Sequence, residues 1–228
     1  MQLSFTSYKL LKWDNYRRVR IMYCEVGCRC MSIDLEKYQG LIFDMDGTLI
    51  DTMPAHIGAW EVTADKFDFP FNYEWFYSMG GMPSYKIARE VNKKHQLDLD
   101  PFEVSSHKMD TFNNMEEHGE LISSTHNILQ ANFGKKKMAV GTGSQRVTAM
   151  ALLEKNEILP KLDAVVTATD VEKHKPEPET FLLAAEKLGL NPKDCVVFED
   201  TELGKQAAHA AGMDCIMVTE GGLSYHPL

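Results

Sequence analysis

Two aspartates separated by one residue end a short apolar run in LIFDMDGTLIDT, residues 41–52. Asp44 and Asp46 carry like charges, and like charges held a few ångströms apart cost free energy unless a cation or a proton relieves the repulsion. The pair therefore indicates either a solvated strand end followed by a turn, or a metal-dependent catalytic site. The polar residues elsewhere in the chain decide between these two interpretations.

More polar residues come at or after the ends of later apolar runs. They are Thr142 and Ser144 in MAVGTGS, Lys175 in HKPEPE, and Glu199 and Asp200 in CVVFED. In open α/β sheets, ligands bind beyond the carboxyl ends of the strands, near the switch in strand order. We therefore expect these hydroxyls, the lysine and all four acids to converge at one edge of a sheet.

The acids match the ligands of a hard divalent cation. Mg²⁺ binds oxygen atoms in an octahedron and keeps several waters, so a few carboxylates are enough to hold it. Asp44 and Asp200, with the backbone carbonyl of Asp46, are the expected ligands, and Glu199 is assigned to the same site, directly or through a water. Mg²⁺ is therefore the predicted cofactor, because it would relieve the repulsion between the first two acids.

The same edge can supply the groups for phosphoryl transfer. Asp44 would attack phosphorus as a nucleophile and form an aspartyl phosphate. Asp46 would protonate the leaving oxygen and later deprotonate the attacking water. Lys175 would offer a compact positive charge, and Thr142 a hydroxyl donor, to the phosphoryl oxygens. These four are the predicted catalytic residues.

The elements that would position these side chains alternate along the chain. Short apolar runs rich in Val, Ile and Ala are typical of strands buried on both faces of a parallel sheet. Such runs follow the first one at residues 137–142, 163–170, 195–200 and 214–220. Helical patterns lie between them at residues 146–158, 178–189 and 202–213. This alternation predicts an α/β fold with a doubly wound parallel sheet.

Residues 53–118 interrupt the alternation with helical patterns and few strand candidates. A stretch of roughly 65 residues is long for one crossover connection. We therefore predict a helical cap domain inserted after the first strand, beside the carboxyl edge of the sheet, and a core made of residues 37–52 and 119–228. A pair of ordinary crossover helices is the alternative.

Residues 1–36 show neither periodicity nor a strand–helix unit, and Met31 begins the segment that leads into the first strand. They are predicted to be a dispensable N-terminal extension. Three thiols in this stretch, Cys24, Cys28 and Cys30, lack an evident fourth ligand and are only a weak zinc signal.

Composition narrows the class of function. The net charge of −9 and a pI near 5.4 carry no footprint of nucleic-acid binding. No apolar run approaches the roughly 18 residues that span a bilayer. Neither a disulfide framework nor a secretory signal is evident, which favours the reducing cytoplasm. The expected protein is a cytoplasmic monomer that acts on a small molecule, with no nucleic-acid or membrane partner.

The motifs, taken in order, resemble those of the haloacid dehalogenase (HAD) superfamily of phosphatases and phosphomutases. They are DMDGT at 44–48, Thr142, Lys175, and the acid pair at 199–200. The resemblance covers about residues 37–220 and implies a Rossmann-like core, with a helical cap inserted after the first motif. A single DxD motif would be weak evidence, whereas four motifs in order on the expected strand pattern are specific.

Within the superfamily, the sequence most resembles the β-phosphoglucomutase-like branch, and more narrowly bacterial phosphatases of fructose 1-phosphate and 6-phosphogluconate. His56 and Trp60 fall where that branch often has a histidine and an aromatic residue at the cap hinge. The residues expected to bind substrate are Thr48, Gly143, Ser144, His56 and Lys108. For His56, a solvated position on a helix surface is the alternative, and for Lys108 a solvated helix face is the favoured interpretation.

One departure from the branch bears on the reaction. In the mutases, an arginine in the segment that corresponds to GGMPSYK holds the distal phosphate. Ser84 stands there in this chain, with Lys86 nearby. Loss of a bidentate guanidinium favours a phosphatase over a mutase. The predicted function is a Mg²⁺-dependent phosphatase of small sugar phosphates, and β-phosphoglucomutase is the alternative.

Functions outside HAD enzymes fit less well. A HAD-like binding module has no need of Asp44 and Lys175, yet both are present. A receiver domain would lack the long insert and the GTL that follows the acids. A P-loop enzyme would carry GxxxxGK[ST], which does not occur in the sequence.

Overall fold

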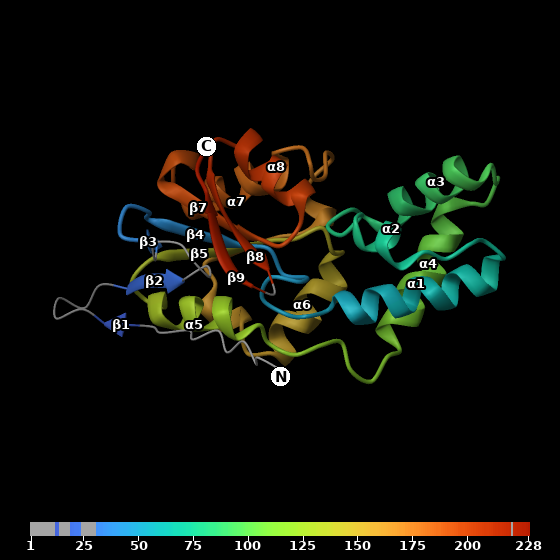
Figure 1. Ribbon diagram of the computed structural model, residues 1–228, viewed down its shortest axis with the longest axis horizontal. Coiled ribbons are helices and arrows are strands. Elements are labelled where there is room, and N and C mark those ends of the chain that lie inside the picture. The colour runs from blue at the N-terminus through green and yellow to red at the C-terminus, as the bar shows by residue number, and fades with distance from the viewer. Residues whose placement is uncertain (1–11, 14–18, 24–30, 220) are drawn as a thin grey trace, which may run out of the picture.

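Six strands form the central sheet of the computed structural model, which describes residues 12–13, 19–23, 31–219 and 221–228. The strands are β4 (Gly40–Phe43), β5 (Lys137–Gly141), β6 (Ala164–Val166), β7 (Cys195–Glu199), β8 (Asp214–Thr219) and β9 (Gly222–His226). Their spatial order is β6-β5-β4-β7-β8-β9 (Figure 1). All pairs are parallel except β8 with β9. The chain builds outward from β4 first to one side and then to the other, so the predicted doubly wound α/β fold is confirmed.

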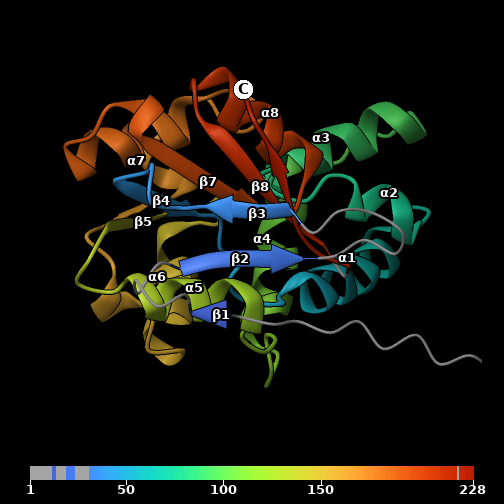
Figure 2. The ribbon, with the colours of Figure 1, turned by 60° about the vertical axis from the view of Figure 1, so that its left-hand side comes forward.

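Helices cover both faces of this sheet, as Figures 1 and 2 show. One face carries α5 (Ser123–Asn132) and α6 (Arg146–Lys155), and the other carries α7 (Glu179–Leu188) and α8 (Glu202–Ala210). Three short 3₁₀ helices complete the connections: Leu159–Lys161, Ala168–Asp170 and Pro192–Asp194. The arrangement has three layers, in which the sheet is the middle one.

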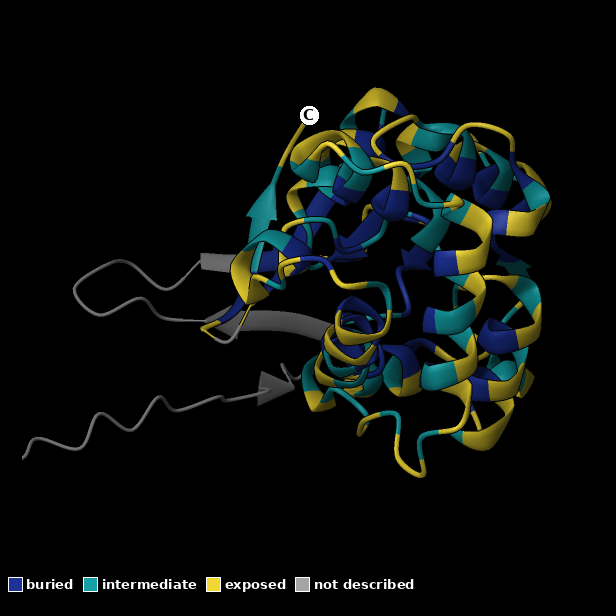
Figure 3. Cartoon of the chain, turned by 90° about the vertical axis from the view of Figure 1, so that its right-hand side faces the viewer, coloured by how far each residue is buried: buried dark blue, intermediate teal, exposed yellow. Residues whose placement is uncertain are grey.

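The spacing of buried side chains along the strands and helices explains these three layers. Along β4, Leu41 and Phe43 join the apolar cluster under α5 and α6, whereas Ile42 joins the cluster under α7 and α8. Both sides of the strand are therefore buried, as the lack of polar alternation predicts. Helix α7 buries Phe181 and Ala184 at helical spacing, and Figure 3 shows buried residues along the strands and on the sides of the helices that face them.

Five helices lie between β4 and β5 in the chain, and the first four make up the helical segment that we call the cap. They are α1 (Met53–Phe67), α2 (Tyr73–Tyr77), α3 (Ser84–His95) and α4 (Pro101–Asn113). Buried side chains from all four, among them Trp60, Phe76, Ile87 and Val104, make an apolar cluster separate from the two clusters of the sheet. This separate cluster supports a cap domain spanning residues 53–118, and the exact division of the chain stays a prediction.

A second, three-stranded antiparallel sheet lies outside the core layers (Figure 2). It contains β1 (Lys12–Trp13), β2 (Val19–Tyr23) and β3 (Met31–Asp34). We expected no regular structure in this part of the sequence, because its apolar runs are very short and interrupted by charges. Ile33 and Leu35 are buried in the same apolar cluster as β4. Cys24, Cys28 and Cys30 lie outside the described residues.

A chain that begins at Met31 is expected to unfold at nearly the same temperature as the full chain and to keep its rate of phosphate release. It loses β1 and β2 but keeps the buried side chains of Ile33 and Leu35. A chain that begins at Glu36 should be less stable by roughly 3–6 kcal/mol, because two buried aliphatic side chains are lost. Thermal unfolding of the three chains checks this. Precipitation of the chain that begins at Met31 would show that the extension is needed.

Asp214, at the start of β8, ties the C-terminal strand to the segment before β4. Its Oδ2 accepts hydrogen bonds from the hydroxyl of Tyr225 at 2.6 Å, from Lys37 at 3.0 Å and from the hydroxyl of Tyr38, and its Oδ1 accepts one from the backbone N–H of Leu228 at 2.9 Å. Partial burial opposes the charge, but the hydrogen bonds led by Tyr225 and Tyr38 outweigh it and hold the pKa of Asp214 well below its usual range.

Asp214→Asn is expected to cost about 1–3 kcal/mol at pH 7, because charge-assisted hydrogen bonds are lost. The folded-state pKa of Asp214 is lowered, so the stabilisation is fully present above the unfolded pKa near 3.9 and is lost as the pH falls towards the folded value. Urea unfolding between pH 5 and about pH 2 should show the two proteins converging as the pH falls below about 4. A difference that stays constant over this range would show that the carboxylate charge is not the stabilising feature.

Candidate active site

Asp44 follows β4 at the point where the strand order reverses. Its backbone N–H donates to the carbonyl of Phe198 at 2.9 Å, which continues the pairing of β4 with β7. The strands β5 and β6 lie on one side of β4, and β7 and β8 lie on the other. This is the place where ligands of open α/β sheets bind. The side chain of Asp44 is 4% exposed, so it is almost completely buried.

Lys175 joins two of the predicted acids. Its Nζ donates to Oδ1 of Asp44 and to Oε1 of Glu199, both at 2.6 Å. The lysine is 2% exposed and Glu199 is completely buried. Burial disfavours the ammonium, but the charges of Asp44 and Glu199 outweigh burial and raise the pKa of Lys175. The lysine is therefore positively charged at neutral pH, as its predicted role requires.

Three carboxylates meet beside this lysine. Asp44, Glu199 and Asp200 each offer an oxygen, and these atoms lie within 4.8 Å of one another. Burial raises the pKa of Asp44 to about 8; Lys175 opposes the shift, while Glu199 and Asp46 add to it. Burial, with the charges of Glu199 and Asp44, also raises the pKa of Asp200. One lysine thus leaves an excess of negative charge, and a donor set of oxygen atoms alone fits a hard divalent cation.

The neighbours of the acids decide which oxygens remain for a cation. Both oxygens of Glu199 are occupied: Lys175 donates to Oε1, and the backbone N–H and hydroxyl of Thr201 donate to Oε2 at 2.6 and 2.8 Å. Asp200 receives one hydrogen bond, from the hydroxyl of Thr48 at 3.0 Å on Oδ1. Within the described part of the chain, one oxygen each of Asp44 and Asp200 remains available. Asp44 and Asp200 therefore fit the role of direct cation ligands better than Glu199 does.

Two glycines make room for these acids. Gly47 has φ +82°, and a Cβ there would lie 2.3 Å from Oδ2 of Asp200. A Cβ on Gly204, near the start of α8, would lie 1.9 Å from Oε1 of Glu199. Any side chain at either position would displace a carboxylate, because real Cβ contacts of this length do not occur.

Asp46 faces a different set of donors. Its Oδ2 accepts hydrogen bonds from the hydroxyls of Ser144 at 2.7 Å and Thr142 at 3.1 Å. Its Oδ1 accepts one from Thr52 at 2.7 Å and lies 3.3 Å from Nε2 of His56. Burial opposes the charge, but the hydrogen bonds led by His56 outweigh it and lower the pKa of Asp46. The surroundings of the two acids of the DxD motif therefore shift their pKa values in opposite directions, upwards for Asp44 and downwards for Asp46.

His56 and Lys108 connect Asp46 to the cap. Nζ of Lys108, on α4, lies 2.6 Å from Nδ1 of His56, on α1, and the imidazole ring stacks on Phe112 at 4.1 Å between centroids. Lys108 is 2% exposed, and burial lowers its pKa to about 7. The favoured interpretation of Lys108 as a solvated helix-surface residue is therefore wrong, and the side chain of His56 is only 15% exposed.

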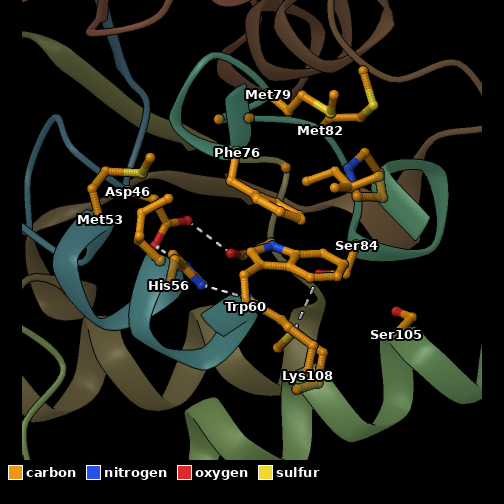
Figure 4. Close-up of a pocket in the computed structure, with 18 of the residues that line it drawn as sticks. Asp46, Met53, His56, Trp60, Phe76, Met79, Met82, Ser84, Ser105 and Lys108 are labelled. Carbon is orange, nitrogen blue, oxygen red and sulfur yellow. Dashed lines mark hydrogen bonds and ion pairs between the residues drawn. The ribbon is translucent and has the colours of Figure 1, made fainter. Parts of the chain in front are cut away.

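A cavity of about 70 Å³ lies between the cap and these acids (Figure 4). The core lines it with Asp44, Asp46, Gly143 and Ser144, and the cap lines it with His56 and Lys108 among others. A Cβ on Gly143 would lie 2.2 Å from the carbonyl oxygen of Gly81, in the loop between α2 and α3. The cap loop therefore touches the core backbone directly beside the cavity.

The structure brings together all the predicted site residues and adds others. Ser84 lines the cavity, whereas Lys86 is not among its lining residues. Thr52 and Thr201 were not predicted, although Thr201 directly follows the acid pair at 199–200, Thr52 lies four residues after DMDGT, and the hydroxyls of both bond the motif acids. Ser105 and the methionines of the cap were also missed, because nothing in their local sequence distinguishes them from ordinary helix and loop residues.

Comparisons with known proteins agree with this geometry. Residues 41–218 match the family model of the haloacid dehalogenase-like hydrolases. Fructose-1-phosphate phosphatase YqaB of Escherichia coli is 40% identical over 188 residues, which cover 80% of this chain and 97% of that protein. Beta-phosphoglucomutase of Bacillus subtilis is 28% identical over 195 residues, which cover 80% and 84% of the two chains.

A solved structure also shares the fold. Beta-phosphoglucomutase from Clostridium difficile superposes with a TM-score of 0.72 at 22% identity, covering 80% of this chain and 85% of that one. None of the helices that the structure describes is long and apolar enough to cross a bilayer. The family match and the relatives named as phosphatases confirm the prediction of a HAD-type phosphatase. The chain belongs to the haloacid dehalogenase-like hydrolase family.

Proposed function

We propose that this protein is a Mg²⁺-dependent phosphatase that hydrolyses small sugar phosphates by way of a phosphoryl group on Asp44. The observation that carries the proposal is the carboxylate of Asp44, bound by the charged Lys175 and facing the cavity beside Asp46. Fructose 1-phosphate is the first candidate substrate, since a relative with 40% identity is named for it. 6-Phosphogluconate is the second, from the resemblance of the motifs.

The first step would transfer the phosphoryl group to the protein. A carboxylate oxygen of Asp44 forms a bond to phosphorus, the ester P–O bond breaks, and the leaving oxygen takes a proton from Asp46. The hydroxyls of Thr142 and Ser144 now bond to Asp46. If both turn to the phosphoryl oxygens, Asp46 loses the hydrogen bond from Ser144, one of those that lower its pKa, and its protonated form becomes more favourable.

The second step would restore the enzyme. Asp46 takes a proton from water, the water oxygen attacks phosphorus, and the bond to Asp44 breaks to release inorganic phosphate. His56, on the other oxygen of Asp46 and backed by Lys108, would orient this carboxylate through both steps. A cation held by Asp44, Asp200 and the backbone carbonyl of Asp46 would supply the charge that stabilises the phosphoryl oxygens.

A phosphomutase is the second candidate, because a beta-phosphoglucomutase is among the relatives. It needs a group that grips the other phosphate of a bisphosphate. The serine at position 84 lines the cavity, but it offers neither charge nor a bidentate fork. The phosphatase is therefore favoured. A monomeric state and a cytoplasmic location remain predictions.

Assays of phosphate release from a panel of phosphorylated metabolites, with Mg²⁺ or excess EDTA, test the proposal. We expect release from sugar phosphates only with the metal. Incubation with β-glucose 1-phosphate and a trace of the 1,6-bisphosphate tests the alternative, since rapid glucose 6-phosphate formation without free phosphate would establish a mutase.

Saturating Mg²⁺ at 100 times its Kd should stabilise the protein by about 2.7 kcal/mol, and Asp200→Asn should remove most of this gain in thermal unfolding.

A further inference from the structure

Hydrogen bonds restrict how many oxygens the three clustered carboxylates can offer a cation. Lys175 donates to Oδ1 of Asp44, and both oxygens of Glu199 already have donors. The hydroxyl of Thr48 donates to Oδ1 of Asp200 at 3.0 Å. Among the residues that the structure describes, Asp44 and Asp200 therefore each keep one oxygen without a donor.

Thr48 lies in the turn that follows β4 and is completely buried. Its carbonyl accepts a hydrogen bond from the hydroxyl of Thr125, on α5, which is also completely buried. We expected Thr48 to bind substrate, but it is not among the residues that line the cavity. Its hydroxyl is instead directed at a carboxylate of the acid cluster.

The same turn also meets the other oxygen of Asp200. A Cβ on Gly47 would lie 2.3 Å from Oδ2, so the backbone of the turn lies directly beside that atom. Residues 47 and 48 thus lie against the two oxygens of one carboxylate and limit its rotation. Because Thr48 bonds to Oδ1, Oδ2 is the oxygen of Asp200 that remains for a cation.

The number of oxygens that each carboxylate offers affects which cation is bound. Mg²⁺ requires a nearly ideal octahedron at about 2.0–2.1 Å, and the two oxygens of one carboxylate lie too close together to fill two of its corners. Ca²⁺ is larger, takes about six to eight oxygens and accepts a bidentate carboxylate. A site in which each carboxylate offers one oxygen therefore suits Mg²⁺ better than Ca²⁺.

Resting on the metal dependence of the proposed function, we infer that Thr48 is a positioning residue whose hydroxyl limits Asp200 to one oxygen for the cation and makes the site selective for Mg²⁺ over Ca²⁺. Thr48→Val removes the hydroxyl and keeps the branched shape. It frees Oδ1, so that Asp200 can bind a larger cation through both oxygens. Groups that orient metal ligands in this way typically contribute about 10–100-fold to metal affinity.

Calorimetric titration of the EDTA-treated protein with MgCl₂ or CaCl₂ measures the two Kd values. We expect the wild type to bind Mg²⁺ more tightly, and the ratio of the Ca²⁺ Kd to the Mg²⁺ Kd to fall by about tenfold or more in Thr48→Val. Thr48→Ser keeps the hydroxyl and should show the wild-type ratio. Thr63→Val is the matched control, because it removes the hydroxyl of another completely buried threonine, which donates to the carbonyl of Ala59 in the cap. Both of its Kd values should equal those of the wild type.

The possible outcomes separate this inference from the proposed function. An unchanged ratio in Thr48→Val would overturn the inference and leave a Mg²⁺-dependent phosphatase in place. If the KM for fructose 1-phosphate at saturating Mg²⁺ also rose, Thr48 would be a substrate-binding residue instead. If Thr48→Val does not fold, the wild type tests the inference, since Ca²⁺ binding as tight as Mg²⁺ binding would overturn it. Binding of neither cation to the wild type would contradict the metal site of the proposed function itself.

Discussion

Replacing Asp44 by asparagine is expected to lower phosphate release by roughly 10⁴-fold or more, because a neutral amide does not attack phosphorus as a carboxylate does. The fold should not suffer. Burial raises the pKa of Asp44 to about 8, so its charge is unfavourable in this position without a cation, and a neutral side chain of the same shape is tolerated. In the absence of Mg²⁺ the variant should unfold at the same temperature as the wild type, or a higher one.

Initial rates with fructose 1-phosphate measure this loss, and mass spectrometry of acid-quenched wild-type protein looks for the phosphoryl group on Asp44. Asp51→Asn is the matched control, since that aspartate follows the same motif but is exposed. It should retain the wild-type rate. Near wild-type release by Asp44→Asn would remove Asp44 from the nucleophile's role, and a phosphoryl group on another residue would relocate it.

Asp46→Asn is expected to cost roughly 10²–10⁴-fold in the rate for sugar phosphates, because general acid and base help is lost. The amide oxygen can still accept hydrogen bonds from Thr142 and Ser144, so the geometry around Asp44 should persist. A nitrophenyl phosphate has a leaving group that needs no proton, and its first step should be much less affected.

The decisive measurement is the ratio of the two losses. Formation of the phosphoenzyme, followed in a single turnover, separates the first step from the second, in which Asp46 would act as a base for both substrates. An equal loss in the first step for the aryl and the sugar phosphate would show that Asp46 serves some other purpose. A purely structural role would instead lower the unfolding temperature.

The core was predictable because its signals are local. A short, mostly apolar run marks each parallel strand, and the polar residues that follow it lie at the carboxyl edge of the sheet. Asp44 and Lys175 were found in this way although 131 positions separate them. Because strands and helices alternate, the strands are parallel, and Asp44 and Lys175 therefore meet at the same edge of the sheet.

The cap was less predictable because its cavity depends on how helices pack. Met79 and Met82 lie in the connection between α2 and α3, and their sequence does not indicate what they face. Lys108 lies on a helix whose pattern is compatible with a solvated lysine, and only the packing of α4 on α1 buries it. The strands β1 and β2 were missed for a related reason, since two to five residues with charges give too weak a period.

The contact between Gly81 and Gly143 has a consequence for the pace of the reaction. The two backbones meet where a single methyl group would not fit, so the cap loop and the core close against each other beside the cavity. A substrate can enter on that side only when this contact between Gly81 and Gly143 opens. The same holds for a product that leaves there. For such a substrate, the rate at which the contact between the cap loop and the core opens is an upper limit on kcat. More reactive acids in the site would not raise that limit.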